Sequence, residues 1–368
     1  MEEKLQLLKS TGSWKNRAVK KLVAQFRKGS TVKKYLLWQL FAGLVSICLV
    51  ARLNADPLQK TLEEAKRDGK LVFYTVLTLP ESQALLKGFQ QKYPFVQPEL
   101  FRLGAEKMRT KILTEARAGR HLFDVTSMDV VETGVLQRQG ILAPYKALAR
   151  DAIPAGLRDD EGYWAGIYVR QFVLAYNTRL VSQKDAPRDW WDLLNPRWKG
   201  KIGMDREETE WYAALAEYWG RDKARKFMRA LAAQNPALHQ GHTLVAKLTV
   251  AGEFPLSIAH ASRVEQIKAQ GAPLDWVDSV DPVVTSPSVI SLSARAPHPN
   301  AARLFIEYVL SREGQMLIHD NFRVTARSDI PPPTKKLDQK RLRLFFVNPK
   351  IADRYNEFQK DYHEIFGQ

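Results

Sequence analysis

YWAGIYVRQFVLAYNT, residues 163–178, joins two runs of β-branched and aromatic residues around a single charged side chain, Arg170. The turn-forming pair Asn177 and Thr178 ends the second run. The pattern predicts a buried strand, yet burying an unpaired guanidinium group costs several kcal/mol. Arg170 must therefore reach solvent or meet an anion, which is either a structural carboxylate or a bound solute.

The composition is that of an ordinary globular protein: 45% of the 368 residues are hydrophobic and 26% are charged. The length favours about two domains or lobes. A net charge of +16 first suggests a nucleic-acid partner. However, residues 1–34 alone hold 10 Lys and Arg against 2 Glu. The excess on the remaining chain is mild, and we expect no nucleic-acid surface.

The N-terminal region is predicted to direct export. Residues 1–34 form a basic leader, and residues 35–55 are either a signal peptide or a transmembrane anchor. The uncharged run at 35–51 is 17 residues long, between the usual length of a signal's apolar region and that of a spanning helix. In both cases the basic side stays in the cytoplasm and the body is exported. Cys48 is the only cysteine, so we expect no disulfide or thiol metal site in the body.

The body alternates short apolar strands with amphipathic helices. Strands are expected at 70–75, 98–102 and 123–127, each followed by a helix. Later in the chain, an amphipathic helix is expected at 209–219 and an irregular segment at 275–282. Such alternation predicts parallel sheets with helices on both faces. In these sheets ligands bind beyond the carboxyl ends of the strands, where helix N-termini favour anions.

Hydroxyl, basic and acidic side chains lie at or just after the ends of several expected strands. For each hydroxyl residue the alternative is a plain helix cap, but repetition at equivalent positions favours a binding site. The candidate ligand-binding residues are Thr75, Thr78, Arg102, Lys107, Ser127, Arg170, Asp205, His260, Ser262 and Arg263.

Residues 298–315, HPNAARLFIEYVLSREGQ, resemble the late helix of bacterial extracellular solute-binding proteins of ABC importers. The closest branch includes ferric-iron, sugar-phosphate, thiamine and aminophosphonate binders. The resemblance covers about residues 58–330 and has four further landmarks in the family's order, at 70–75, 89–94, 162–177 and 250–255. It implies a two-lobed α/β fold of the periplasmic-binding-protein-like type II, with parallel-rich sheets flanked by helices and with crossing hinge strands.

The resemblance also implies lobe limits, a partner and a location. The first lobe would comprise residues 56–170 and 286–340, and the second residues 171–285 and 341–368. The strand at 163–178 would carry the chain from one lobe to the other. We expect a periplasmic monomer without a cofactor that delivers its solute to an ABC permease in the cytoplasmic membrane. Retention of the 35–51 segment would tether it there.

The expected ligand is a small phosphorylated or carboxylated anion. Ferric members of the family resemble one another in two adjacent tyrosines, where this chain has Ala261 and Ser262. Losing both phenolates removes most of the charge compensation that Fe(III) needs. Hydroxyl and guanidinium groups suit phosphate or carboxylate instead. A ferric-iron carrier with a site lacking tyrosine remains the alternative.

An enzyme is not predicted. The sequence has no nucleophile elbow, P-loop, Rossmann glycine pattern or His pair on one helix face. Asp124 and Asp129 form the best carboxylate pair, and Asp124 lies within an expected strand, which favours a structural role. The remaining alternative is a membrane-anchored sensory or scaffold module that uses the same fold and retains the 35–51 helix.

Overall fold

The computed structural model describes residues 57–367. The chain divides into two compact units, residues 1–60 and 61–368, and α4 (Pro57–Asp68) spans this limit. The predicted leader and the apolar run at 35–51 lie outside the described residues. Among residues 57–367, no helix is long and apolar enough to cross a membrane.

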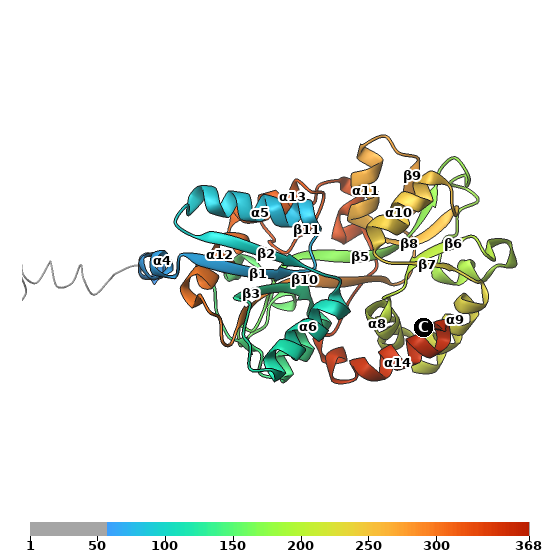
Figure 1. The fold of residues 1–368 in the computed structure, drawn as a ribbon. Helices are drawn as coiled ribbons and strands as arrows, with labels where there is room; N and C mark the ends of the chain where they lie inside the picture. Colours follow the sequence, from blue (N-terminus) through green and yellow to red (C-terminus); the bar gives the residue numbers. More distant parts are fainter. Residues whose placement is uncertain (1–56, 368) are drawn as a thin grey trace, which may run out of the picture. The chain divides into compact units, whose positions relative to one another are not determined.

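A continuous sheet of 12 strands, ordered β2-β1-β3-β10-β5-β8-β6-β7 along its main path, organises the second unit (Figure 1). We call its part up to Gln171 of β5 the first half-sheet. The strands β1, β2 and β3 are parallel, as predicted. The strands are β1 (Lys70–Thr75), β2 (Gln97–Arg102), β3 (Val125–Asp129), β4 (Leu142–Ala143), β5 (Ala165–Asn177), β10 (Val283–Ser293) and β11 (Val324–Thr325).

Helices cover both faces of the first half-sheet, and Figure 1 shows α5 and α6 on opposite sides of it. Phe73 of β1 and Phe89 of α5 both pack edge-on against Phe305 of α12, with ring centroids 5.0 and 5.1 Å apart. These fully buried rings anchor β1 and therefore the loop at its carboxyl end. The helices are α5 (Leu79–Lys92), α6 (Ala105–Arg117), α7 (Val130–Arg138), α12 (Pro299–Leu310) and α13 (Arg312–His319).

The second half-sheet begins at Phe172 of β5. Its strand β6 is parallel to both β7 and β8. Gly203 on β6 leaves room for the Phe254 ring, because a Cβ at this glycine would lie 2.0 Å from a ring carbon. The remaining strands and helices are β6 (Ile202–Asp205), β7 (Ala237–His239), β8 (Leu256–His260), β9 (Leu274–Val277), α8 (Thr209–Trp219), α9 (Arg221–Ala233), α10 (His242–Ala251) and α11 (Ala261–Ala269).

The predicted strand at 163–178 is confirmed as β5, which belongs to both half-sheets. Its pairing changes from β10, where Gln171 lies opposite Thr285, to β8, where Phe172 lies opposite His260. Both pairings are antiparallel, so the expected parallel order does not extend to the crossing strands. Two neighbouring strands run parallel only when a crossover connection, usually a helix, returns the chain to the same end of the sheet. β5 enters the second half-sheet directly from the first, without such a connection.

The segment at 275–282 was expected to be irregular, and this expectation is wrong for its first residues. Leu274–Val277 forms β9 and pairs with the end of β5. The indole of Trp276 is buried and donates a hydrogen bond to Glu265 at 2.8 Å. Pairing with the edge of β5 gives this backbone its hydrogen bonds.

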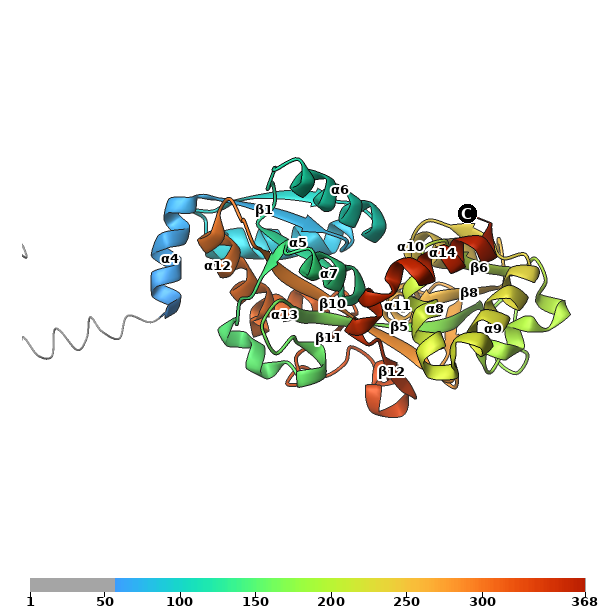
Figure 2. The same cartoon turned by 90° about the horizontal axis from the view of Figure 1, so that it is seen from below.

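The C-terminal segment connects helices of both half-sheets. It comprises β12 (Leu344–Phe346), a short 3-10 helix (Pro349–Asp353) and α14 (Tyr355–Phe366). The 3-10 helix packs on α7, and α14 packs on α8 and α9 (Figure 2). The ring of Phe358 on α14 lies edge-on to the ring of Tyr212 on α8, with the ring centroids 5.6 Å apart. The final helix therefore covers two helices of the second half-sheet.

Candidate functional site

One face of the sheet carries a series of polar side chains near the strand ends. Residues directly opposite each other on paired strands, and residues two apart on one strand, share a face. The registers link these pairs across β1, β3, β10, β5 and β8. The resulting series is Thr75, Ser127, Asp129, Ser288, Ser286, Arg170 and His260.

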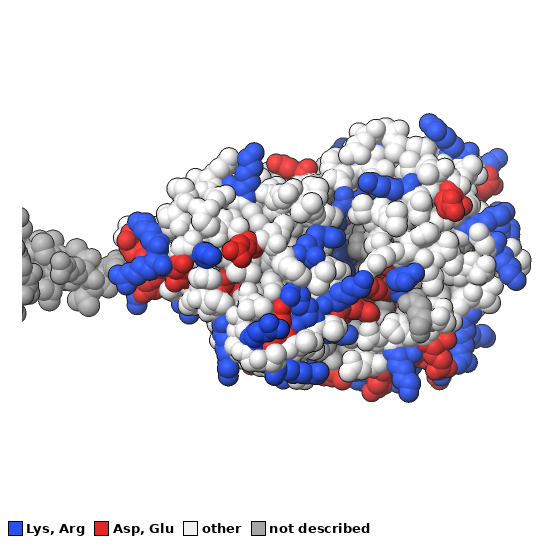
Figure 3. All heavy atoms as spheres, viewed as in Figure 1, with Lys and Arg blue, Asp and Glu red and all other residues white. Residues whose placement is uncertain are grey.

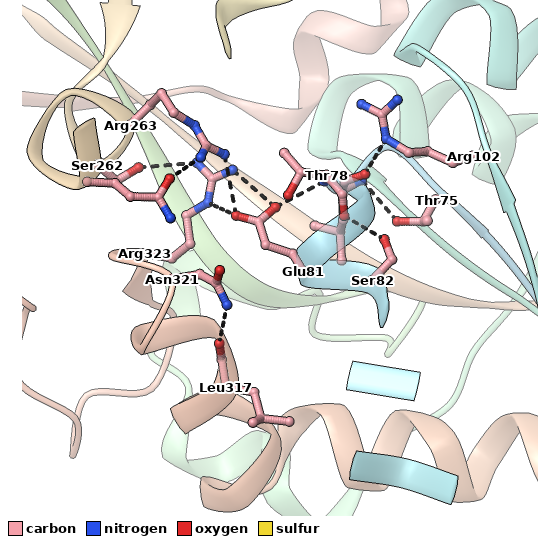
Figure 4. Close-up of polar contacts among 12 residues, drawn as sticks. Thr75, Thr78, Glu81, Ser82, Arg102, Ser262, Arg263, Leu317, Asn321 and Arg323 are labelled. Atoms are coloured by element: carbon pink, nitrogen blue, oxygen red, sulfur yellow. Dashed lines mark hydrogen bonds and ion pairs between the residues drawn. The ribbon is translucent and has the colours of Figure 1, made fainter. Parts of the chain in front are cut away.

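The loop after β1 is held by three of the predicted residues (Figure 4). Thr75 Oγ1 accepts a hydrogen bond from the backbone N–H of Leu77 at 3.0 Å. Arg102 Nε donates to the carbonyl of Leu77 at 2.6 Å. Thr78 precedes α5, and its backbone N–H donates to the Glu81 carboxylate at 3.0 Å. These contacts fix the loop and position Glu81.

Glu81 is the centre of a charged cluster that joins the half-sheets (Figure 4). Arg323, next to β11, donates to its carboxylate from Nε at 2.7 Å and from Nη2 at 3.3 Å. Arg263 of α11 approaches the same carboxylate, with Nη2 3.6 Å from Oε1. Arg323 Nη1 also donates to Ser262 Oγ at 3.2 Å. Predicted residues 262 and 263 thus meet Glu81 and Arg323 from across the junction.

The charges in this cluster do not balance. Two guanidinium groups share one carboxylate, and the side chains of Glu81, Arg323 and Arg263 are 1%, 6% and 12% exposed. Burial opposes ionisation of Glu81, but Arg323 and Arg263 outweigh it and lower its pKa to about 2. Burial and the Arg323 charge lower the pKa of Arg263 to about 10. Nη2 of Arg263 has no hydrogen-bond partner.

Arg170 lies in a second cluster, which is rich in carboxylates. Its Nη2 donates to Glu210 Oε2 at 2.7 Å and to Ser286 Oγ at 2.8 Å. Asp129 Oδ2 lies 3.8 Å from its Nη1. Burial raises the pKa of Glu210 to about 7 although Arg170 opposes the shift. Arg170 is one of the candidate ligand-binding residues, but the structure pairs it with two carboxylates of the protein itself.

His260 forms a close pair with His242, whose ring centroid is 3.7 Å away and whose ring plane is tilted by 34°. Its Nε2 is buried without a hydrogen-bond partner. Predicted residue Asp205 lies beside the pair, with Oδ2 3.7 Å from His242 Nε2. Burial lowers the pKa of both imidazoles, and the neighbouring His242 and Arg170 lower that of His260 further. Both rings are therefore neutral at pH 7.

Ser127 and Lys107 remain outside these contacts. The Ser127 hydroxyl is fully buried and has no hydrogen-bond partner. Lys107 is exposed on α6, and its charge lowers the pKa of Glu207. Burial and the nearby Glu106 carboxylate outweigh this effect and raise the Glu207 pKa to about 7. No contact joins Lys107 to the Glu81 cluster.

The space-filling view shows a hollow between the parts of the molecule that hold the two half-sheets (Figure 3). Lys and Arg side chains lie at its edge. Residues 57–367 contain no group of three or more His, Cys, Asp or Glu that could hold a metal ion. The described side chains at the junction offer guanidinium, hydroxyl and imidazole groups, together with the carboxylates of Glu81 and Glu210.

Sequence reasoning missed Glu81, Arg323, Glu210 and His242. The spacing from Thr78 to Glu81 is that of a capping box, which could have identified a carboxylate fixed at the start of α5. Arg323 had no comparable signal, because its partner Glu81 is 242 residues away. Its role depends on the packing of α13 and β11 beside α5.

Residues 125–345 match the family described as bacterial extracellular solute-binding protein. The chain belongs to this family. This solute-binding protein is 25% identical over 191 residues to the Fe(3+)-binding periplasmic protein of Serratia marcescens, covering 49% of the chain and 56% of the relative. It is 26% identical over 206 residues to a Salmonella typhi protein named for periplasmic 2-aminoethylphosphonate binding, covering 52% and 59%. The chain thus spans little more than half the length of these relatives.

Among solved structures, the solute-binding protein is similar to the periplasmic binding protein AfuA from Actinobacillus pleuropneumoniae with exogenous fructose-6-phosphate bound. The TM-score is 0.75 at 22% identity, over 81% of this chain and 99% of the other. The likeness confirms the two-lobed type II fold. We call each half-sheet, with the helices that cover it, a lobe, and the Glu81 cluster joins side chains of the two. The resemblance inferred from the sequence is also confirmed.

Proposed function

We propose that this solute-binding protein captures a small phosphorylated or carboxylated anion between its lobes and delivers it to an ABC permease. One observation carries the proposal: the buried guanidinium groups of Arg263 and Arg323 share the single carboxylate of Glu81. One carboxylate does not balance two buried guanidinium groups, and a solute anion is the kind of group that such guanidinium groups bind. We therefore place the anionic group of the solute beside Arg263.

The surrounding groups suit such an anion. A guanidinium group donates two parallel hydrogen bonds to phosphate or carboxylate oxygens. The first turn of α11, which begins at Ala261, has backbone N–H groups without intrahelical partners, and its dipole favours negative charge. The Arg263 and Ser262 side chains extend from that turn. We propose that the remaining candidates Thr75, Thr78, Arg102, Lys107, Ser127, Arg170, Asp205 and His260 surround the rest of the solute.

The names of the relatives support a choice between two ligand classes. The Salmonella protein is named for a phosphonate, and the Actinobacillus structure holds a sugar phosphate. Both of these ligands carry a tetrahedral anionic group. The Serratia protein is named for ferric iron, which keeps an iron carrier as the second candidate. Ala261 and Ser262 supply no phenolate, and this favours the anion.

A thermal-shift panel on the full chain tests the proposal. The panel contains inorganic phosphate, sugar phosphates, alkyl phosphonates, small carboxylates and ferric citrate. A true ligand at 100 times its Kd adds about 2.7 kcal/mol to the free energy of unfolding. We expect stabilisation by at least one anion class. Stabilisation by ferric citrate alone would overturn the proposal. Native mass spectrometry of the protein purified from cells would identify a retained solute.

Whether residues 35–51 are removed or retained distinguishes a free carrier from an anchored module. We propose export of the body, with the segment either removed or kept as a tether. A mature N-terminus near Asp56 would indicate a free carrier. An intact Met1 in the membrane fraction would indicate a tether, and it would leave open a sensory or scaffold role for the fold.

A further inference from the structure

Glu81 occupies the position that an anionic solute needs. Its carboxylate accepts two hydrogen bonds from Arg323 and lies 3.6 Å from Arg263 Nη2. This fork geometry is the one that a phosphate or carboxylate ligand adopts with arginine. We call the place between the two guanidinium groups and Ser262 the anion seat.

We propose that Glu81 is a built-in competitor for the anion seat, so that a solute binds there only by displacing its carboxylate. The role rests on the proposed function, because it assigns the same seat to the solute. Glu81 belongs to the first lobe, whereas Arg263 and Ser262 belong to the second. In the absence of solute, the carboxylate therefore bridges the lobes in the solute's place.

The competitor is always charged and always near. Its pKa is about 2, so it is ionised at neutral pH. Its backbone is fixed in the first turn of α5, where the Thr78 N–H donates to the carboxylate. An intramolecular group of this kind competes at a high effective concentration. Monocarboxylates that bind weakly are thus excluded from the anion seat. Anions that bind strongly to both guanidinium groups displace Glu81.

Displacement makes a quantitative prediction. If the free protein holds Glu81 in the seat for most of the time, the apparent Kd of every anion is raised by the same factor. Glu81→Gln should therefore tighten inorganic phosphate and acetate equally, by about tenfold or more. If the Glu81 carboxylate instead stayed in the anion seat beside the bound anion, it would repel the phosphate dianion more strongly than the acetate monoanion. The variant would then gain far more affinity for phosphate than for acetate.

The experiment is titration calorimetry of the full chain at pH 8 with inorganic phosphate, and with acetate in competition with phosphate. The matched control is Glu99→Gln, whose carboxylate is 62% exposed and pairs with Lys70 at 3.7 Å. We expect this control to match wild type. If Glu81→Gln does not fold, Glu81→Ser removes the carboxylate and keeps a polar residue at the helix start.

Each other outcome overturns a defined statement. Weaker binding of both probes would mean that Glu81 positions Arg323 instead of competing. Displacement would also be refuted if Glu81→Gln bound both probes as wild type does, or if it gained affinity for phosphate alone. In either case, binding of phosphate to the wild-type protein would still support the proposed function. If neither probe bound wild type or variant, the proposed function would fail as well.

Discussion

Nη2 of Arg170 donates a hydrogen bond to Oε2 of Glu210 at 2.7 Å and thereby ties the crossing strand β5 to helix α8 of the second lobe. Ser286 of β10 donates to the second oxygen of the same carboxylate at 2.7 Å. The ion pair thus lies where the chain passes between the lobes. The charge that looked anomalous within a strand is compensated inside the protein.

Arg170→Ala should destabilise the protein by about 3–5 kcal/mol, because it leaves the buried Glu210 and Asp129 carboxylates without their counter-ion. Urea unfolding measures the loss. The control is Arg229→Ala, a 59% exposed side chain that lies 4.0 Å from its carboxylate, and it should cost less than about 1 kcal/mol. Equal effects of the two substitutions would contradict the buried ion pair. Unchanged phosphate affinity in folded Arg170→Ala would assign Arg170 a structural role only.

Gly203→Ala should destabilise the second lobe, because its Cβ would lie 2.0 Å from the Phe254 ring. Overpacking of this kind costs about 1–3 kcal/mol or more. Gly156→Ala is the control, since an added Cβ there meets no atom within 4 Å. Urea unfolding should separate the two variants clearly. A Gly203→Ala protein as stable as the control would show that the ring moves aside freely.

Stability should fall as the pH drops below about 6.5, in part because of His260. Burial holds its pKa well below the ordinary value, so the unfolded chain takes up the proton first. At pH 5.5 one such histidine costs about 1.4 kcal/mol relative to pH 7.5. His260→Phe should lose less stability between these pH values than wild type. His363→Gln, on the partly exposed surface of α14, should behave as wild type, and a parallel loss in all three proteins would refute the assignment.

Much of the fold was predictable from the sequence because its signals are local. The strand Lys70–Thr75 and the helix Thr209–Trp219 have the limits that their hydrophobic patterns gave. The crossing strand was visible in residues 163–178 because both of its runs are apolar. The early part of 275–282 was misjudged, because β9 depends on pairing with a distant strand rather than on its own composition.

The sequence by itself determined the family, the strand order along the chain and the residues that end the strands, since each depends on neighbours within a few positions. Only the tertiary structure decided which charges meet. Glu81 finds Arg323 across 242 positions, and Arg170 finds Glu210 across 40. Such pairings arise from the packing of helices against a shared sheet. A local pattern can place a guanidinium group at a strand end, but only the folded chain brings it a carboxylate.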